Sequence, residues 1–335
     1  MNTPNPSSSP KTSTVSGNTA GAPVRLSWAS LKRSTVFYPF VGLAVVCVVM
    51  VFASNSFLSA ANIENVLRQV SINAIIAVGM TCVILTGGID LSVGSVMALS
   101  GTLAAGLMVA GMNAAAALVV GIAVGLGFGA ANGFFVAYAG MPPIIVTLAT
   151  MGIARGLALI YTGGYPIDGL PDWVSFFGSG KVLGVQAPVV IMLVIYAIAW
   201  VLLERMPFGR YVYAIGGNEQ ATRLSGVRVA RVKLIVYMLA GLTSAFASIV
   251  LTARLMSGQP NAGIGFELDA IAAVVMGGTS ISGGRGSIIG TLIGALLLGV
   301  LNNGLNMVGV NPYVQNVIKG GIILLAIYIS RDRRK

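Results

Sequence analysis

Three asparagines lie close together in one apolar stretch: Asn302, Asn303 and Asn306 in the sequence LNNGLNMVG. Asn302 and Asn306 are four residues apart, so a helix would place both side chains on one face. An amide donates and accepts hydrogen bonds, and in apolar surroundings it can serve two purposes. It can bond the hydroxyl groups of a polar solute in passage, or it can bond a neighbouring helix. Both interpretations stay open.

Four charged residues also lie in or beside apolar segments. Asp90, in GGIDLSVG, precedes an expected helix and would either cap it from the cytoplasmic side or act as a polar gate. Arg155 lies inside an apolar stretch, where a charge serves function or a structural pairing. Glu267 and Asp269 open a short apolar segment at its expected outer side, where they would cap a helix or receive a partner protein.

The histidine and cysteine content of the chain does not indicate catalysis. The chain has no histidine, and its two cysteines, Cys47 and Cys82, lie inside apolar segments. A zinc site, a disulfide framework and histidine acid–base chemistry are therefore not expected. The glycine cluster SGGRGS at 282–287 lacks both the spacing and the lysine of a phosphate-binding loop. We expect no enzyme, no metal and no cofactor in this chain.

The composition is that of a membrane protein. Hydrophobic residues make up 56% of the 335 residues and charged residues only 9%, against about 25% charged residues in soluble domains. Residues 91–154 and 286–318 contain no charged residue at all. The net charge of +11 does not indicate nucleic-acid binding, because the basic residues lie between hydrophobic segments rather than on a soluble domain.

Apolar windows separated by glycine, proline or charged breaks predict an all-α polytopic membrane protein of about ten spans, with eight as the lower bound. The eighth window is short and begins with Glu267 and Asp269, so it would enter the membrane without necessarily crossing it. The windows are 36–54, 66–86, 91–111, 114–139, 143–162, 187–204, 233–256, 267–281, 287–305 and 313–330.

The distribution of lysine and arginine predicts the orientation. With a cytoplasmic N-terminus, 15 of the 20 basic residues fall on the cytoplasmic side, as the positive-inside rule requires. Both termini are then cytoplasmic. We expect residues 1–33, rich in Ser, Thr, Pro and Asn, to form a disordered cytoplasmic tail, and residues 331–335 to form a short basic one.

A polar, basic loop at 205–232 interrupts the apolar sequence. Asn218 after two glycines is a good helix N-cap, and Gly226 is a good helix stop, so a short helix is expected between them outside the bilayer. From the residues alone, this loop would either bind the anionic headgroups of membrane lipids or contact another protein. A fainter pattern is the similarity of NAIIAV at 73–78 to DAIAAV at 269–274, which leaves an internal repeat open.

Several long motifs resemble one family. They are VILTGGIDLSVGS at 83–95, GRYVYAIGGNEQATRLSGVRVARVKLIVY at 209–237, GFELDAIAAVVMGGTSISGGRGSIIGTLIGALLLG at 265–299 and LNNGLNMVGV at 301–310. In this order they resemble the permease subunits of bacterial ATP-binding-cassette sugar importers of the ribose permease type. The likeness covers most of residues 55–330.

The resemblance implies an importer-permease fold over residues 34–330, whose loop 205–232 carries a coupling helix that docks on a separate cytoplasmic ATPase. It also implies a periplasmic sugar-binding protein, a second copy of the chain and a place in the bacterial inner membrane. The transported solute would be a monosaccharide, with ribose expected before other sugars. Carried over residue by residue, the coupling residues are Gly217, Asn218, Ala221, Arg223 and Gly226.

The same resemblance gives the polar membrane residues their expected roles. Asp90, Arg155 and the three asparagines would line or gate the translocation pathway, and Glu267 and Asp269 would dock the binding protein. The alternative is an ion-coupled secondary sugar transporter. Such carriers rely on carboxylates at mid-depth in the membrane, whereas the acidic residues here fall at the ends of expected spans.

Overall fold

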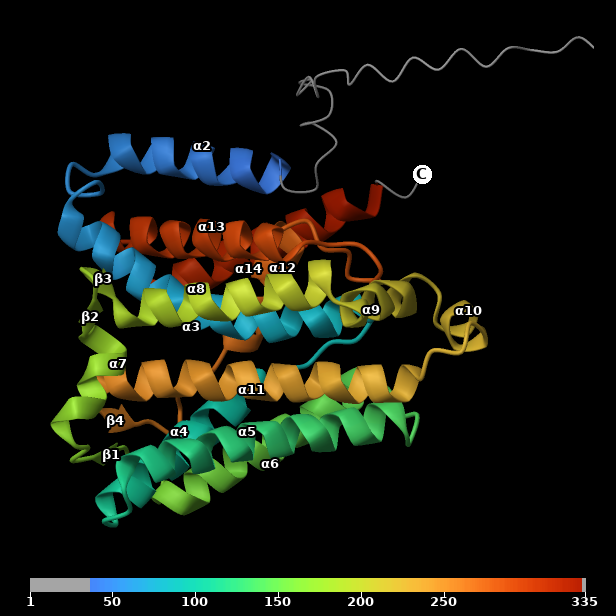
Figure 1. Ribbon diagram of the computed structural model, residues 1–335. Coiled ribbons are helices and arrows are strands. Elements are labelled where there is room, and N and C mark those ends of the chain that lie inside the picture. The colour runs from blue at the N-terminus through green and yellow to red at the C-terminus, as the bar shows by residue number, and fades with distance from the viewer. Residues whose placement is uncertain (1–36, 333–335) are drawn as a thin grey trace, which may run out of the picture. The chain divides into compact units, whose positions relative to one another are not determined.

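Each of the ten predicted apolar windows contains a helix in the computed structural model (Figure 1), which describes residues 37–332, the side chains of residues 323 and 325–332 excepted. The predicted N-terminal tail, residues 1–33, lies outside the described residues. So does the last part of the predicted C-terminal tail, whose first two residues continue the final helix. The ten helices are α2 (Phe37–Ala53), α3 (Ala60–Leu85), α4 (Val93–Val109), α5 (Ala114–Ala137), α6 (Pro143–Thr162), α8 (Ala187–Trp200), α11 (Val229–Leu255), α12 (Phe266–Met276), α13 (Ile288–Met307) and α14 (Pro312–Asp332).

Within residues 37–332, six helices are long and apolar enough to cross a membrane, judged by length and composition. They are α3, α5, α6, α11, α13 and α8, the last together with its π-helical extension η2 (Val201–Arg205). Helices α2 and α4 are apolar but have only 17 residues each, and a span needs about 20. The protein is therefore helical with several spans, and the total of eight to ten stays a prediction.

The second helix begins earlier than the sequence suggested. The predicted window is 66–86, yet Asn62 and Glu64, which precede it, both lie in the first turns of α3. The reason is a local cap. The hydroxyl of Ser59 accepts the N–H of Asn62 at 3.3 Å, and the Asn62 amide donates to the Phe57 carbonyl at 2.8 Å. These bonds satisfy polar groups that would otherwise oppose a helix start.

Helix α12 is too short to cross the membrane alone. Its 11 residues rise by about 17 Å, against about 30 Å for the hydrocarbon layer. It follows a loop in which Gly263 and Gly265 adopt positive φ angles of 71° and 83°. A Cβ on Gly94 of α4 would lie 2.2 Å from the Gly263 carbonyl oxygen and 2.7 Å from Oε2 of Glu267. The start of α12 is therefore wedged inside the bundle against the start of α4.

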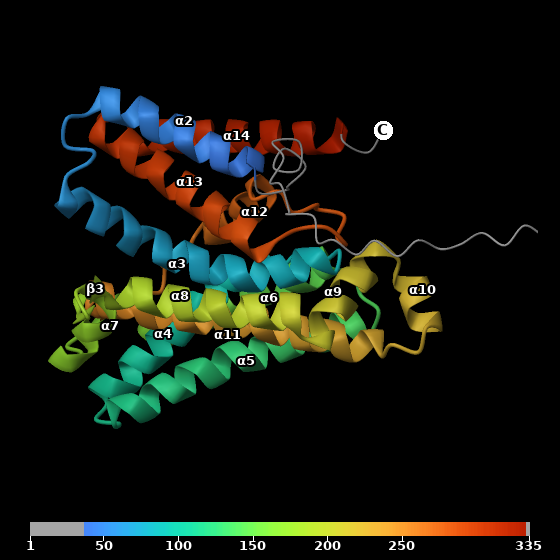
Figure 2. The ribbon, with the colours of Figure 1, turned by 45° about the horizontal axis from the view of Figure 1, so that its top comes forward.

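Two polar structures occupy opposite ends of the helices (Figures 1 and 2). At one end, α9 (Pro207–Gly217) and α10 (Glu219–Leu224) form the predicted polar loop. At the other end, the connection between α6 and α8 contains η1 (Asp172–Ser175), α7 (Phe176–Ser179) and two small antiparallel pairs. β1 (Ile167–Asp168) pairs with β4 (Ser257–Gly258), and β2 (Lys181–Val182) pairs with β3 (Val185–Gln186).

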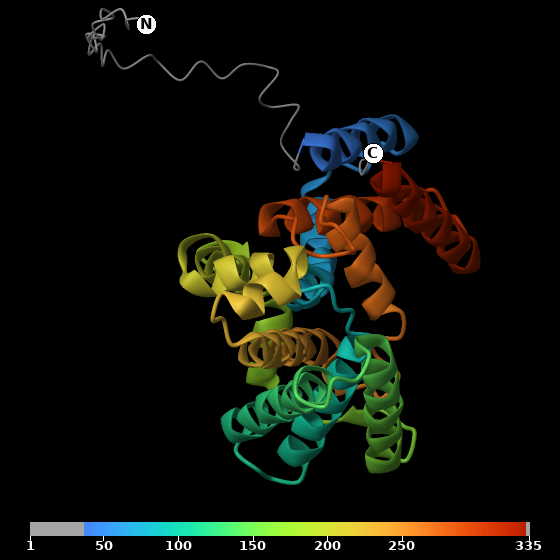
Figure 3. The ribbon, with the colours of Figure 1, turned by 90° about the vertical axis from the view of Figure 1, so that its right-hand side faces the viewer.

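Helix α3 lies at the centre of the bundle, with 78% of its apolar window buried, and it packs against α8, α11, α12 and α13. Figure 3, seen from the end that carries α10, shows α3 between α11 and the layer of α12 and α13. Glycines bring helices into direct backbone contact. A Cβ on Gly125 of α5 would lie 2.5 Å from the Gly241 carbonyl oxygen, and one on Gly294 would lie 2.0 Å from that of Ala273.

Candidate functional site

Helix α10 stands out from the bundle as a short projecting helix (Figures 1 and 2). Asn218 caps it as predicted, since its Oδ1 accepts the N–H of Ala221 at 2.9 Å. Gly226, just past the end of the helix, has a φ of 84°, which favours glycine and turns the chain toward α11. The five residues expected to couple the chain to a partner, Gly217, Asn218, Ala221, Arg223 and Gly226, are all exposed on this projection.

The exposed surface of α10 includes a residue that the sequence analysis missed. Leu224 is 89% exposed at the last position of the helix, next to Arg223. Its exposure follows from the anchoring of the opposite side, where Thr222 is buried and donates to the Asn218 carbonyl at 2.8 Å. An exposed leucine beside an arginine is a combination suited to a protein partner, because it offers apolar area and a forked donor together.

Glu219 fixes the position of α10 relative to α11. Its carboxylate pairs with Lys233 of α11 at 2.6 Å and with Arg223, one turn along α10, at 3.1 Å. The Lys233 side chain is only 18% exposed, so this ion pair is shielded more than a surface pair. This pair therefore links α10 to the beginning of α11.

Glycines join α9 to the end of α3 and to the loop between α12 and α13. The Gly284 N–H donates to the Leu85 carbonyl at 3.0 Å. A Cβ on Gly216 would lie 1.9 Å from that same carbonyl oxygen and 2.3 Å from the Gly284 nitrogen. Tyr213 of α9 adds a hydrogen bond of 3.3 Å to the Gly286 carbonyl, and burial together with the charge of nearby Glu204 raises the pKa of Tyr213 to about 12. We call this contact the glycine joint.

Asp90 does not cap α4, so that interpretation is wrong. The helix starts at Val93 after Ser92, and Asp90 bonds Ser92 instead. Its Oδ1 accepts the Ser92 N–H at 2.9 Å and the Ser92 hydroxyl at 2.6 Å, while Asn132 of α5 donates to that hydroxyl at 2.9 Å. Asp90 is 1% exposed, and burial raises the pKa of its carboxyl above the ordinary value. The residue ties the 86–92 loop to α5.

Arg155 of α6 holds the loop that precedes α12. Its Nη1 donates to the Pro260 carbonyl and, at 2.9 Å, to the Ala262 carbonyl. Glu267, in the first turn of α12, accepts the N–H of Gly265 at 3.3 Å. Arg155 and Glu267 therefore shape the entry to α12.

Asp269 bonds residues of two neighbouring helices. Its carboxylate accepts from the Asn73 amide at 3.4 Å and pairs with Lys319 of α14 at 3.5 Å. Asn73 is near the middle of α3, and the Asp269 side chain is 16% exposed. The Asp269 carboxylate therefore faces α3 and α14, while Leu268 beside it is 55% exposed. The place of Asp269 relative to a membrane surface stays a prediction.

The three asparagines of α13 separate into two kinds. Asn303 and Asn62 of α3 bond each other reciprocally at 2.9 and 3.1 Å, and Asn306 accepts from Gln315 of α14 at 2.7 Å. For these two residues the helix-bonding interpretation is confirmed. Asn302 is 8% exposed, and its Oδ1 has no hydrogen-bond partner among the described residues, a state that costs about 1–3 kcal/mol.

Asn302 and Asn73 share a cavity that sequence analysis had not found. The cavity measures about 20 Å³ and lies between α3, α12 and α13. The Oδ1 of Asn73 is also buried, with no partner in the described part of the chain. The available signal was the resemblance of NAIIAV to DAIAAV, since Asn73 and Asp269 open these two sequences and meet in space. The cavity is lined by Gln69, Val70, Asn73, Asp269, Ala273, Ala295, Leu298, Gly299 and Asn302.

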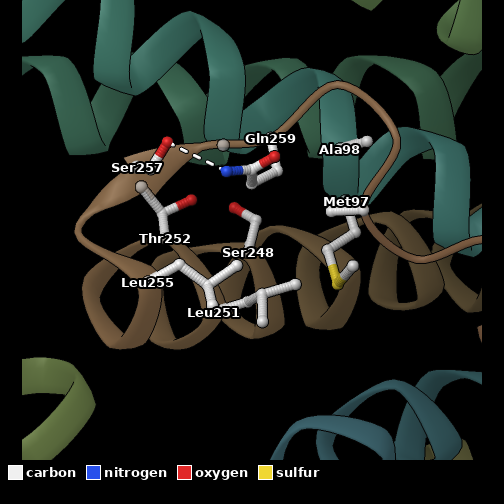
Figure 4. A pocket seen from close by; sticks show the side chains of 10 residues that line it. Met97, Ala98, Ser248, Leu251, Thr252, Leu255, Ser257 and Gln259 are labelled. Carbon is white, nitrogen blue, oxygen red and sulfur yellow. Dashed lines mark hydrogen bonds between the residues drawn. The ribbon is translucent and has the colours of Figure 1, made fainter. Parts of the chain in front are cut away.

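Two other cavities do not suit a polar solute. The one in Figure 4, between α4, α11 and the 257–262 loop, contains Ser248, Thr252 and Gln259 but measures only about 10 Å³. It is at the lower limit for one water molecule. The second, of about 110 Å³ between α3, α8 and α11, has a lining of hydrocarbon side chains apart from Cys82 and Thr243. Such a lining leaves the hydroxyl groups of a polar solute unbonded.

The chain belongs to the family described as branched-chain amino acid transport system / permease component, whose pattern it matches over residues 62–327. It is thus a transport-system permease with several membrane-spanning helices.

Within that class the chain is similar to ribose import permeases. It is 52% identical over 297 residues to the ribose import permease protein of Bacillus subtilis (strain 168), covering 88% of this chain and 92% of the relative. It is 48% identical over 298 residues to that of Escherichia coli (strain K12), covering 88% and 93%. The D-allose transport system permease protein of Escherichia coli (strain K12) is 41% identical over 289 residues, covering 85% and 88%. No solved structure matches the chain.

Proposed function

We propose that this protein is the membrane-spanning subunit of an ATP-binding-cassette importer that brings ribose across the bacterial inner membrane. Two copies would enclose the path, a periplasmic sugar-binding protein would deliver the sugar, and a cytoplasmic ATPase would supply the energy. The names of the most similar relatives support the sugar, with ribose ahead of D-allose because the identity is higher. Both termini and the loop 205–232 would then be cytoplasmic.

The observation that carries this proposal is the projecting helix α10. A carrier driven by an ion gradient has no need of such a helix, whereas an importer powered by a separate ATPase needs a contact for it. Leu224 and Arg223 give that contact apolar area and charge. Asn218 and Ala221 would set its shape through the cap, Gly226 through its positive φ of 84°, and Gly217 as the last residue of α9.

The glycine joint offers a route from the ATPase to the sugar path. Closure of the ATPase would move α10 and α9, and backbone-to-backbone contact at Gly216 and Gly284 would move the ends of α3 and of the loop between α12 and α13. Because closely packed backbones have few intermediate arrangements, we expect two discrete states, one open inward and one open outward. Asp90 would secure the neighbouring loop, and Arg155 with Glu267 would gate the entry to α12.

Binding-protein docking is expected at the end of the bundle opposite α10. That end carries β1 to β4 and α7. Asp269 faces Lys319 inside the bundle, so we do not propose it for docking. Glu267 is half-buried at the entry of α12, and we propose that it shapes this entry and does not contact the binding protein directly.

Reconstitution tests the proposal. The purified chain is placed in lipid vesicles with its ATPase, and ribose uptake is measured with the loaded binding protein outside and ATP inside. Uptake should require all three components. Uptake that continues on a proton or sodium gradient without ATP and ATPase would replace the importer with an ion-coupled sugar carrier. A complex that is active on D-allose and inactive on ribose would keep the mechanism and change the sugar.

A further inference from the structure

We propose that Asn73, Asn302 and Asp269 form a contact site for the hydroxyl groups of the sugar inside the bundle. This inference rests on the proposed function and adds where in the protein the sugar is recognised during passage. The three residues come from α3, α13 and α12 and line the same cavity.

The comparison of two asparagine pairs between the same helices supports the proposal. Near one end of α3, Asn62 and Asn303 of α13 satisfy each other with two hydrogen bonds. Deeper along α3, Asn73 and Asn302 each retain a buried Oδ1 with no partner in the described chain. The first pair has the geometry of an interhelical link. In the second pair both Oδ1 atoms are free to accept a hydrogen bond, which is the arrangement expected of a site for a ligand that donates hydrogen bonds.

The chemistry of the open groups selects a polyol. A sugar hydroxyl donates one hydrogen bond and accepts others, and an amide can meet it with either its oxygen or its nitrogen. A small solute with several hydroxyl groups can therefore donate to the side-chain oxygens of Asn73, Asn302 and Asp269, which lie on three different helices. Since the Asp269 carboxylate is already paired with Lys319 at 3.5 Å, the site has no unbalanced charge that would favour a cation. A neutral solute rich in hydroxyl groups fits this site better than an ion.

The dimensions indicate a closed state. A cavity of about 20 Å³ holds about one water molecule and no sugar. Opening requires movement of the helices that carry the lining. The short helix α12 and α14 are joined across the site by Asp269 and Lys319, and α12 continues into the loop that meets the glycine joint. Movement of α10 can therefore widen the site without disturbing the Asn62–Asn303 link.

The test pairs deletions on the protein with deletions on the sugar. Vesicles containing the complete transporter are given ATP and a saturating concentration of binding protein loaded with ribose, or with each monodeoxy analogue of ribose that it retains. For Asn302→Leu we expect the rate of ribose uptake to fall about tenfold, because the loss of one hydrogen bond worth about 1.4 kcal/mol changes a rate by that factor. In the wild type, at least one deoxy analogue should be slower by a similar factor, and in Asn302→Leu that analogue should be no slower than ribose.

The matched control is Asn303→Leu, the same change at the next residue of α13. It should lower the stability of the protein through the loss of the Asn62 bond. It should also change the uptake rates of ribose and of its deoxy analogues by one common factor. A common factor for Asn302→Leu as well, or unchanged ribose uptake, would overturn the inference. If Asn302→Leu fails to insert into the membrane, Asn302→Ser and Asn73→Leu are used in its place, and the same changes in uptake are expected of them. Absence of ATP-driven ribose uptake in the wild type would instead refute the proposed function.

Discussion

Asn73 of α3 donates from its amide nitrogen to Oδ2 of Asp269 in α12 across 3.4 Å. The two residues are 196 positions apart and open the two similar sequences NAIIAV and DAIAAV. A similarity of six residues is weak by itself, but here its first members meet in the interior of the bundle. The meeting point places the Asp269 carboxylate beside the middle of α3, the central helix of the bundle.

The ion pair of Asp269 with Lys319 gives the first prediction. Asp269→Asn leaves the lysine, whose side chain is 20% exposed, without its partner, and Lys319→Met leaves the carboxylate without its own. Each single change should lower the free energy of unfolding by about 3 kcal/mol. The double variant Asp269→Asn/Lys319→Met should recover most of this loss, because no uncompensated charge remains.

Thermal unfolding of the four proteins in detergent measures this coupling. Two single losses that add up in the double variant would show that the two side chains act independently, contrary to the structure.

Reversal of the charge on α10 gives the second prediction. Arg223→Glu should keep membrane insertion and ATP hydrolysis by the complex while lowering uptake by about tenfold or more, since a partner carboxylate would be repelled. The measurement is the number of sugar molecules imported per ATP hydrolysed. Arg228→Glu is the matched control. It makes the same charge change at an exposed site just before α11 and should leave this ratio unchanged. A normal ratio in Arg223→Glu would remove this residue from the coupling contact.

Some of these features could be predicted from the sequence because they depend on neighbours in the chain. The Asn218 cap needs only the N–H of Ala221, three residues away, and the turn at Gly226 needs only a positive φ. The apolar windows likewise depend on local composition, and each contains a helix. Local physics was sufficient for the projecting helix.

Other features depend on packing and were missed or misjudged. Asp90 follows a break and precedes a helix, which suits a cap, yet its carboxylate accepts from Ser92, whose hydroxyl in turn accepts a hydrogen bond from Asn132 of a different helix. The depth of Asp269 depends on the loop before α12 entering the bundle, where Gly263 fits against Gly94. Asn303 is hydrogen-bonded to Asn62, whereas the Oδ1 of Asn302 has no partner among the described residues. This difference depends on the rotation of α13 against α3. No local pattern distinguishes these two adjacent asparagines.

Adjacent glycines in α9 give the third prediction. A Cβ at Gly216 would lie 1.9 Å from the Leu85 carbonyl oxygen, whereas one at Gly217 would have nothing within 4 Å among the described residues. Gly216→Ala should therefore force α9 away from α3 and lower the free energy of unfolding by about 1–3 kcal/mol. Gly217→Ala should change it by about 0.5 kcal/mol or less. Detergent unfolding of both variants makes the comparison, and equal effects would contradict the glycine joint.

The buried carboxyl of Asp90 gives the fourth prediction, which concerns pH. Burial raises its pKa in the folded protein above the ordinary value of 3.8, so the folded state holds this proton more tightly than the unfolded state does. The resulting stabilisation is complete below the unfolded pKa and is lost as the pH rises through the raised folded pKa. Within this window stability should decline by at most about 1.4 kcal/mol per pH unit from this group.

Asp90→Asn removes the titrating proton while an amide oxygen still accepts from Ser92, so its unfolding curve should lack this part of the pH slope. The measurement is thermal unfolding of the wild type and the variant in detergent from pH 4 upward, the lower limit being close to the ordinary value of 3.8 for the carboxyl. Asp172→Asn makes the same change at an exposed residue of the opposite end and should leave the slope in place. If wild type and Asp90→Asn lose stability in parallel, the proton on Asp90 does not contribute. The 86–92 loop would then be held by the Ser92 and Asn132 bonds alone, with Asp90 charged.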